Sequence, residues 1–474
     1  MTRERSHAPR ARAALRALPA LALRTTSKAL ALLAALTALA GCSGGGGDAP
    51  ARKPHIILVS IDTLRPDHLG CYGYERDTSP YLDSLAAQST LFERAYTTLS
   101  FTLVAHMSMH TGLYPAQHGV WKQDQKLPGA VPLLAEQLQA AGYHTVGLYD
   151  SRWLDPHFGF DRGFDVYEPH AGAPVAGMHL ETALRRRPAD EPLFVFLHLM
   201  DVHNKPVDRP GATLYEPPEP YDSLFVPDAK ERLADAPVAT YWKDASAITP
   251  EEQEAVVALY DGGIRYVDTW LERWFGRLAE NGILDDAVLL ITSDHGEGLN
   301  QRGDSFFAHG KWFEEGLRVP LILRRPDGAE GGRRVDTPVS LVDVVPTLLD
   351  AAGLEVDTDL PGASLLGTPP KDRVIHAESP TRFEVAVRYP WKLVETRRET
   401  YLADLDSAEA ESEPHFDGGA DAEAQNRLDA LRGRAEADRA AWSRPLQGAA
   451  EAGALSPEAV AELKALGYLG DEDG

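Results

Sequence analysis

The feature that most constrains the fold is the short apolar run His55–Ile61, which ends at Asp62. A continuous apolar stretch of this length, without polar alternation, is typical of a parallel strand buried on both faces. Similar runs recur at Thr145–Tyr149, Leu193–Leu199, Val288–Thr292 and Pro320–Leu323. These runs predict a central sheet whose two faces are both covered.

Helical patterns lie between the predicted strands, for example at Tyr81–Ala87, Val131–Ala141 and Glu251–Leu278. Strands that alternate with helices favour an α/β fold, here a three-layer sandwich with a central, mostly parallel sheet, over residues 54–355. We expect long loops at 152–190 and 204–248, and the second is rich in Pro and acidic residues. Such a loop could form a lid or part of a substrate-binding wall.

Residues 356–474 differ in character and predict a small C-terminal α+β subdomain. Trp391–Val394 and Thr400–Leu402 could pair as short antiparallel strands, and the acidic stretch 404–424 follows them. Capping residues at both ends predict a short helix over 457–466.

The N-terminus resembles a secretory signal over residues 1–41, with a basic stretch before the apolar run Ala29–Ala40. The apolar run is too short to span a bilayer, which takes roughly 20 residues. The tetrad Leu39–Ala40–Gly41–Cys42 resembles a bacterial lipobox, and residues 42–53 resemble a flexible tether. We therefore expect an extracytoplasmic protein held by lipid at Cys42 to the envelope, in the outer membrane, on its periplasmic or outer face. The alternative is an ordinary secretory signal with an incidental cysteine.

The formal net charge of the 474-residue chain is −24. An acidic surface of this kind repels polyanions and argues against nucleic acid as a partner. A phosphate or sulfate group would need a local positive charge, which a metal ion could supply. Cys71 is the only thiol besides Cys42, so we expect neither an internal disulfide nor a cysteine-based zinc site.

Acidic and imidazole side chains follow two of the predicted strands. Asp62 closes the first strand, and Asp294 and His295 follow Val288–Thr292. Ligands of open α/β sheets gather at the carboxyl ends of the strands, so these side chains should meet. Two carboxylates and one imidazole suit Mn²⁺, Zn²⁺ or Mg²⁺, with Ca²⁺ less favoured, and either one or two ions. The alternative is that the acids cap helices or bind water.

Thr102 opens the helical stretch Leu103–Thr111, which Gly112 ends. A hydroxyl at a helix N-terminus lies where negative charge is favoured, and metal coordination would make it a nucleophile. His106 follows four residues later on the same face, where it could bind the substrate oxyanion or assist proton transfer. The alternatives are an ordinary helix cap for Thr102 and a half-buried polar residue for His106.

Several motifs in consistent order resemble those of the sulfatase family, within the alkaline phosphatase superfamily. They are Ser60–Tyr74, Thr111–Pro115, His118–Val120, Asp201–His203, Ser293–Glu297 and Glu314–Leu321. The resemblance implies that four residues hold the metal: Asp62, Thr102, Asp294 and His295. It also implies that His203, with either His309 or Lys311, contacts the anionic group or protonates the leaving group.

Two departures from the family pattern shape the expected chemistry. Sulfatases carry a cysteine or serine that is oxidised to formylglycine, but Thr102 stands there, and its β-methyl group would give a ketone. Thr63 replaces the usual second aspartate. Threonine nucleophiles resemble the branch with phosphodiesterases and phosphoglycerol or phosphoethanolamine transferases, and the lack of several membrane helices favours a hydrolase.

We therefore expect a metal-dependent hydrolase that cleaves a phosphate or sulfate ester through Thr102, with the phosphoester favoured. Its substrate would be a small molecule or an ester of a glycan or lipid. One alternative is a sulfatase without formylglycine, and another is a catalytically inactive, glycan-binding envelope lipoprotein.

Overall fold

The structure is a computed structural model that describes residues 52–204, 212–234, 236, 248–302, 307, 309–326, 328–407, 411, 422–442 and 451–452. The expected signal segment 1–41, Cys42 and the expected tail helix 457–466 lie outside the described residues. Their interpretation stays a prediction.

A large sheet forms the centre of the described chain, and nine of the described strands belong to it. They are β1 (His55–Ile61), β2 (Thr90–Tyr96), β4 (His144–Tyr149), β5 (Val166–Pro169), β6 (Leu193–Leu199), β7 (Ala287–Thr292), β8 (Arg318–Arg324), β9 (Arg334–Val335) and β10 (Val339–Ser340). Their order is β10-β2-β8-β7-β1-β6-β4-β5, with β9 beside β2. β1 runs parallel to both β6 and β7, whereas β8 is antiparallel to β7 and β2. The expected mostly parallel sheet is confirmed.

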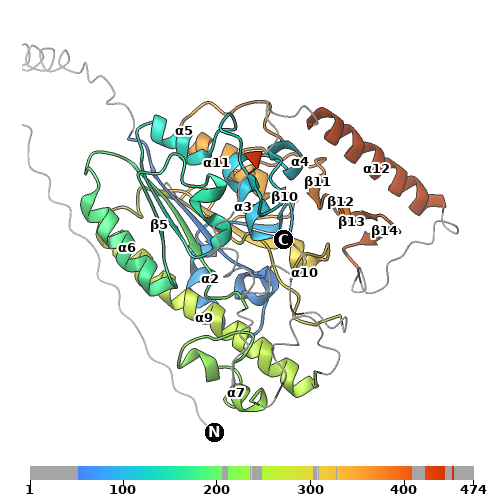
Figure 1. Cartoon of the computed structure of the whole chain (residues 1–474), viewed down its shortest axis with the longest axis horizontal. Helices are drawn as coiled ribbons and strands as arrows, with labels where there is room; N and C mark the ends of the chain where they lie inside the picture. Colours follow the sequence, from blue (N-terminus) through green and yellow to red (C-terminus); the bar gives the residue numbers. More distant parts are fainter. Residues whose placement is uncertain are drawn as a thin grey trace, which may run out of the picture. The chain divides into compact units, whose positions relative to one another are not determined.

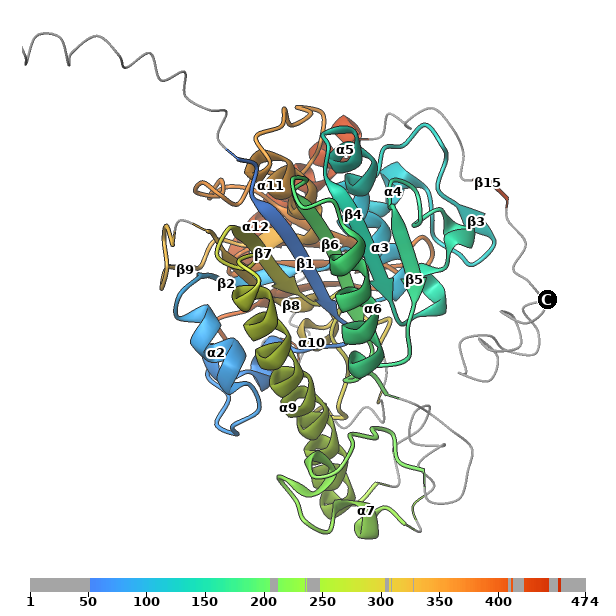
Figure 2. The ribbon, with the colours of Figure 1, turned by 90° about the vertical axis from the view of Figure 1, so that its left-hand side faces the viewer.

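Helices cover both faces of this sheet. Figure 2 shows α6 (Ala173–Arg186) and α9 (Pro250–Glu280) lying across one face, and α2 (Pro80–Ala86) packs on the same side. The other face carries α3 (Thr102–Thr111), α5 (Leu134–Ala140) and α11 (Val344–Ala351). Alternate residues of β1 contribute to the two cores: Ile57 and Val59 to the first, Ile56 and Leu58 to the second. The three-layer sandwich is therefore confirmed.

The expected loop at 152–190 is in part wrong, because it contains β5 and the 14-residue helix α6. The buried face of α6 consists of Ala173, Ala176, Leu180 and Ala183. Three of these four side chains are small, so the apolar period of the helix is weak in the sequence. None of the described helices is both long and apolar enough to cross a membrane.

A smaller antiparallel sheet forms the C-terminal subdomain, with β11 (Ile375–Glu378), β12 (Phe383–Arg388), β13 (Trp391–Thr396) and β14 (Thr400–Asp404). The expected pairing of the last two strands is confirmed, since Val394 lies opposite Tyr401. Figure 1 shows α12 (Ala422–Trp442) against this sheet, where Leu428 packs on Leu393 and Leu402. The other face packs on the residues that lead into α3, so the subdomain borders Thr102.

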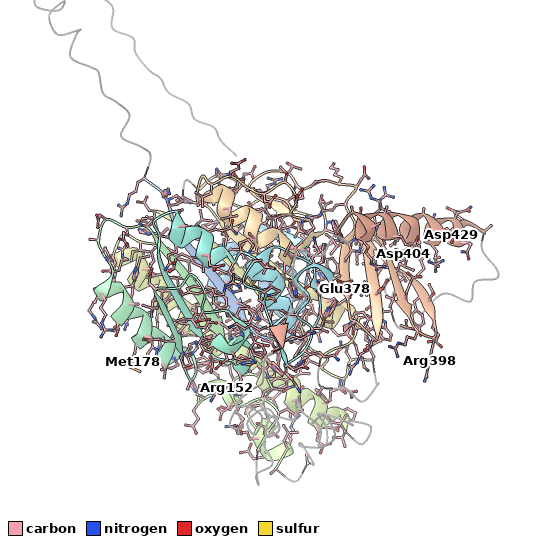
Figure 3. The ribbon with its side chains drawn as sticks, turned by 45° about the horizontal axis from the view of Figure 1, so that its top comes forward. Arg152, Met178, Glu378, Arg398, Asp404 and Asp429 are labelled. Atoms are coloured by element: carbon pink, nitrogen blue, oxygen red, sulfur yellow. The ribbon has the colours of Figure 1, made fainter. Side chains whose placement is uncertain are left out.

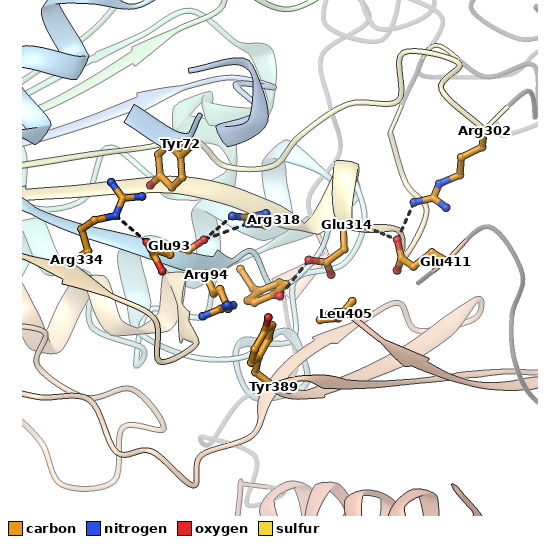
Figure 4. A pocket seen from close by; sticks show the side chains of 11 residues that line it. Tyr72, Glu93, Arg94, Arg302, Glu314, Arg318, Arg334, Tyr389, Leu405 and Glu411 are labelled. Atoms are coloured by element: carbon orange, nitrogen blue, oxygen red, sulfur yellow. Dashed lines mark hydrogen bonds and ion pairs between the residues drawn. The ribbon is translucent and has the colours of Figure 1, made fainter. Parts of the chain in front are cut away.

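The junction between the small sheet and the edge of the large one holds a cavity of about 470 Å³, shown in Figure 4. Its charged groups are paired within the protein. The Arg334 guanidinium lies 2.7 Å from the Glu93 carboxylate, and Arg302 lies 2.8 Å from Glu411. The fully buried Lys392 ammonium also lies 2.7 Å from the carboxylate of Glu411. The Arg302–Glu411 pair ties the C-terminal subdomain to the large domain, whereas the Arg334–Glu93 pair joins β9 to β2 within the large sheet.

Candidate active site at the carboxyl ends of the central strands

The side chains that the sequence places at the strand ends form one buried cluster. Asp62 follows β1, and Asp294 and His295 follow the neighbouring strand β7. Their ligand atoms lie within 4.8 Å of one another, and all three residues are 0% exposed. Oδ1 of Asp62 and Oδ2 of Asp294 have no hydrogen-bond partner among the described residues. Orphaned buried carboxylate oxygens are costly unless a cation satisfies them.

The turn after β1 holds these carboxylates together through an uncommon backbone conformation. Thr63 has a φ of 57°, in the left-handed region that β-branched residues rarely adopt. Its N–H donates to Oδ1 of Asp294 at 3.4 Å, and its carbonyl accepts from the Tyr260 hydroxyl of α9 at 2.8 Å. Strain of this kind persists where surrounding contacts fix it, and here it sets Asp62 beside Asp294.

The two carboxylates differ in their tendency to ionise. Burial alone would raise the pKa of Asp62, but the imidazoles of His203, His198 and His295 hold it well below its usual range. Burial, together with the charge on Asp62, raises the pKa of Asp294 well above its usual range. Two buried carboxylates this close do not both ionise unless a positive charge lies between them.

The imidazole of His295 is oriented as a ligand. Burial, and the nearby ring of His309, lower its pKa well below the usual value, so the ring is neutral. Its Nδ1–H donates to the Gly296 carbonyl at 2.9 Å, which leaves the lone pair of Nε2 directed toward Asp294 Oδ2, 3.4 Å away. This donor set of two carboxylates and one neutral imidazole fits Zn²⁺, Mn²⁺ or Mg²⁺.

Thr102 lies at the edge of this cluster as the first residue of α3. Its Oγ1 is 3.3 Å from Nε2 of His295 and 3.5 Å from Oδ2 of Asp62. The first turn of a helix also directs backbone N–H groups toward negative charge. The hydroxyl could therefore serve both as a metal ligand and as a nucleophile.

His106 lies beside the ligand cluster, with its Nδ1 3.6 Å from Oδ2 of Asp294. Its Nδ1 donates to the Thr102 carbonyl at 2.8 Å, and its Nε2 lies 3.0 Å from the Ser60 hydroxyl. Burial lowers its pKa to about 3, so the ring is neutral. Both ring nitrogens have partners within the protein, and contact of His106 with a substrate oxyanion stays a prediction. His106 joins the first turn of α3 to β1.

His198, on β6, is a functional candidate to which the sequence motifs assigned no role. Its Nε2 lies 3.2 Å from Oδ2 of Asp62, and its Nδ1 accepts from the Asp150 N–H at 3.4 Å. It therefore donates to the carboxylate and orients it. The available signal was its position in the strand that pairs with β1, three residues before Asp201.

Two further histidines approach the cluster from loops. Nε2 of His203 lies 3.9 Å from Oδ1 of Asp62, and the ring of His309 lies 4.5 Å from that of His295. The rings of His203 and His309 are 5.6 Å apart. Both expected histidines therefore belong to the same site.

Glu297 also belongs to this site, although the sequence motifs assigned no role to it. The carboxylate accepts from the Tyr215 hydroxyl at 2.5 Å and from the side-chain amide of Asn204. Its Oε1 lies 3.8 Å from Nδ1 of His309. Burial raises its pKa to about 7. Only its position after Asp294–His295 pointed to it.

Lys311 and Asp201 are not among the residues whose ligand atoms form the cluster. The Lys311 ammonium is 5.8 Å from the centre of the Phe313 ring, and its side chain lines a cavity against the small sheet. The Asp201 carboxylate accepts from the Ala173 N–H at 3.0 Å and so caps the start of α6. Of the two expected alternatives, His309 is the residue beside the cluster.

Comparison with known proteins gives one consistent family. Residues 54–354 match the family model described as Sulfatase. An uncharacterized sulfatase of Escherichia coli, YidJ, is 26% identical over 360 residues, which cover 66% of this chain and 71% of that protein.

Two solved structures share the fold. A phosphonate monoester hydrolase of Agrobacterium radiobacter has a TM-score of 0.66 and 22% identity, covering 82% of this chain and 96% of its own. A protein solved with its substrate D-glucosamine-2-N,6-O-disulfate also has a TM-score of 0.66, with 20% identity over 83% of this chain and 99% of its own.

Proposed function

This chain belongs to the sulfatase family, an ester hydrolase family of the alkaline phosphatase superfamily, and on that premise we propose that Thr102 is the nucleophile of a phosphate or sulfate ester hydrolase. The observation that carries the proposal is the Thr102 hydroxyl, 3.3 Å from Nε2 of His295 and 3.5 Å from Oδ2 of Asp62. In this geometry, a hydroxyl at a helix N-terminus lies against the buried ligand cluster.

The residues that would hold a divalent metal are Asp62, Thr102, Asp294 and His295. When bound, the metal would stabilise the negative charge that develops on the ester oxygens. The bound ion would also favour ionisation of the Thr102 hydroxyl, which the carboxylates alone would oppose. One or two ions fit this proposal.

The chemistry divides into two displacements. The Thr102 hydroxyl releases its proton to solvent as Oγ1 attacks phosphorus or sulfur. The bond to the leaving oxygen breaks, and that oxygen takes a proton from His203 or His309. Water then cleaves the covalent threonine ester and restores the hydroxyl. Both imidazoles border the cluster, which supports their assignment as the acid. Such general acid help is worth roughly 10²–10⁴-fold in rate.

A phosphoester is the favoured substrate. Thr102 cannot give the aldehyde on which formylglycine chemistry depends, because its Cβ carries a methyl group. One protein of the same fold is named for phosphonate monoester hydrolysis, which supports attack at phosphorus. The other was solved with a sulfated sugar, which supports a small-molecule or glycan ester.

A sulfatase that works without formylglycine is the second candidate. It is favoured by the sulfatase name of the Escherichia coli relative and by the disulfated sugar bound to the second structure. In this alternative the same hydroxyl attacks sulfur.

Parallel turnover assays test both candidates. p-Nitrophenyl sulfate, p-nitrophenyl phosphate and bis(p-nitrophenyl) phosphate are each supplied with Mn²⁺, Zn²⁺, Mg²⁺ or Ca²⁺. We expect phosphoester turnover to exceed sulfate turnover, and Thr102→Ala at saturating metal to lower kcat by roughly 10³-fold or more. Thr102→Ser keeps a hydroxyl and should retain most of the activity. Unchanged turnover by Thr102→Ala would refute the nucleophile.

The envelope location is a further part of the proposal, and its support is the lipobox-like tetrad ending at Cys42. Detergent-free fractionation of cells should recover the wild-type chain with membranes and the Cys42→Ser variant in the soluble fraction. Equal distribution of the two would exclude lipid attachment at Cys42.

A further inference from the structure

A cavity of about 400 Å³ lies where the loop after His309 meets the small sheet. Its basic lining residues are Lys311, Arg382, Arg397 and Arg398, and Glu399 is the one acid that lines it. The Glu399 carboxylate accepts a hydrogen bond from the Tyr401 hydroxyl. Excess positive charge at one place is notable in a chain of net charge −24.

The arginines of this cavity differ from those of the cavity in Figure 4. There, Arg334 and Arg302 pair with carboxylates. Here, none of the guanidinium groups of Arg382, Arg397 and Arg398 has a hydrogen bond or ion pair to another described residue. Figure 3 shows Arg398 projecting outward from the small sheet. Their donors are therefore available to a ligand.

Aromatic side chains also line the cavity, namely Trp312, Phe383 and Tyr401. Trp312 is half-buried and lies edge-to-face on Phe383, with ring centres 5.7 Å apart. Its ring is stacked on that of Tyr401 at 6.1 Å. Apolar ring faces beside guanidinium groups match a sugar ring that carries an anionic substituent, because the C–H face packs on the aromatic ring and the anion accepts from arginine.

The cavity shares a loop with the catalytic cluster. Lys311 follows His309 by two residues, so their Cα atoms are at most about 7 Å apart. The Ser100 hydroxyl accepts from the Gly310 N–H and donates to the Lys311 carbonyl, each at 3.0 Å. Ser100 precedes Thr102 by two residues. The loop is thus held at a fixed place beside the proposed nucleophile.

We propose that this cavity is a subsite for a second anionic group on a saccharide substrate whose scissile ester lies at Thr102. The inference rests on the proposed function and narrows its substrate class to saccharides with at least two anionic groups. Arg397 and Arg398 bind the second anion, Arg382 lies over Gly310 at the entrance, and Trp312 packs against the sugar. A local positive region also offsets the repulsion of anions by the acidic body.

Binding measurements on the full chain with Thr102→Ala test the subsite without turnover. Three disaccharides of the same sugars serve as probes: one with a single sulfate, one with two sulfates, and one with a sulfate and a uronate carboxylate. Isothermal titration calorimetry gives the affinities. We expect a second anion to tighten binding about 10-fold, and Arg397→Ala/Arg398→Ala to abolish that gain. The third probe distinguishes a sulfate from a carboxylate as the second anion.

Arg185→Ala/Arg186→Ala is the matched control, because it removes an equal charge from adjacent exposed arginines in α6. It should retain the preference for the doubly charged probes. Equal loss in both double variants, or no preference in the parent chain, would overturn the subsite. The aryl ester assays contain no second anion, so they test the function of Thr102 separately from this result.

Discussion

Nε2 of His198 lies 3.2 Å from Oδ2 of Asp62, so an imidazole of β6 holds the carboxylate that closes β1. The two residues are 136 positions apart in the chain, and the parallel pairing of β1 with β6 brings them together. The other oxygen of Asp62 has no hydrogen-bond partner among the described residues. The contact therefore fixes one carboxylate oxygen and leaves the second for a ligand.

Loss of this contact should weaken metal binding. We expect His198→Ala to raise the Kd for the metal by roughly 10–100-fold, because an unoriented carboxylate is a poorer ligand. His198→Gln keeps a side-chain N–H donor and should restore part of the affinity. Metal titration with a fluorescent competitor measures both variants. Equal Kd values for wild type and His198→Ala would show that Asp62 needs no such support.

The carboxylate pair predicts that metal stabilises the folded protein. Removal of metal with a chelator should lower Tm, and at 100 times Kd the bound ion adds about 2.7 kcal/mol to the free energy of unfolding. Asp294→Asn removes one ligand charge and should abolish the metal-dependent rise in Tm. The metal-free variant should be at least as stable as metal-free wild type, because one buried carboxylate is gone. Differential scanning calorimetry of wild type and Asp294→Asn, each with and without metal, measures these changes in Tm.

Asp268 lies on α9, and its carboxylate is not part of the active site. From its buried carboxylate we predict that the stability of the fold depends on pH. Burial raises its pKa to about 7, although its carboxylate accepts from the Leu82 N–H at 2.8 Å and the Tyr81 N–H at 3.1 Å. The ordinary pKa of an aspartate is about 4, and the pKa of Asp268 in the folded protein is about 7. Between these two pH values the unfolded chain has released the proton, whereas the folded chain still binds it. The free energy of unfolding therefore falls as pH rises, by at most roughly 4 kcal/mol.

Asp268→Asn provides the comparison for that pH dependence. Near pH 4 the variant should be less stable than wild type by about 1 kcal/mol, because an amide is a poorer acceptor for the two N–H groups. Its free energy of unfolding should change less than that of wild type between pH 4 and pH 7. Urea denaturation at several pH values measures both chains. Parallel curves for the two would exclude Asp268 as the origin of the slope.

From the ion pairs of Lys392 we predict a large contribution to the attachment of the small sheet to the large domain. Its ammonium is fully buried and lies 2.9 Å from Glu314 and 2.7 Å from Glu411. Burial would lower its pKa, but the two carboxylates raise it, so the group stays charged. Lys392→Met leaves the carboxylates unpaired and should destabilise the fold by roughly 3–5 kcal/mol. Exposed Lys371→Met should change stability little, and a similar cost for both would contradict the role of the pairs.

The fold could be predicted largely because strand runs are local signals. Leu193–Leu199 was expected as a strand and coincides with β6, since a run of six apolar residues and one histidine suits a strand buried on both faces. α6 was missed because its buried face is mostly alanine, which carries little apolar signal. Its contribution depends on close packing against other elements, which no local pattern records.

The candidate ligands Asp62, Asp294 and His295, with Thr102 beside them, also follow from the sequence, because strand ends and a helix start are local features with known places in an α/β sheet. Only the tertiary structure assigned the histidines. It placed Nδ1 of His106 3.6 Å from Oδ2 of Asp294, directed His198 at Asp62, and set the ring of His309 beside that of His295. Such choices depend on ring orientation and, for His198 and Asp62, on a contact between residues 136 positions apart. Chain order fixes which residues reach the sheet edge, but three-dimensional packing decides which atoms face one another.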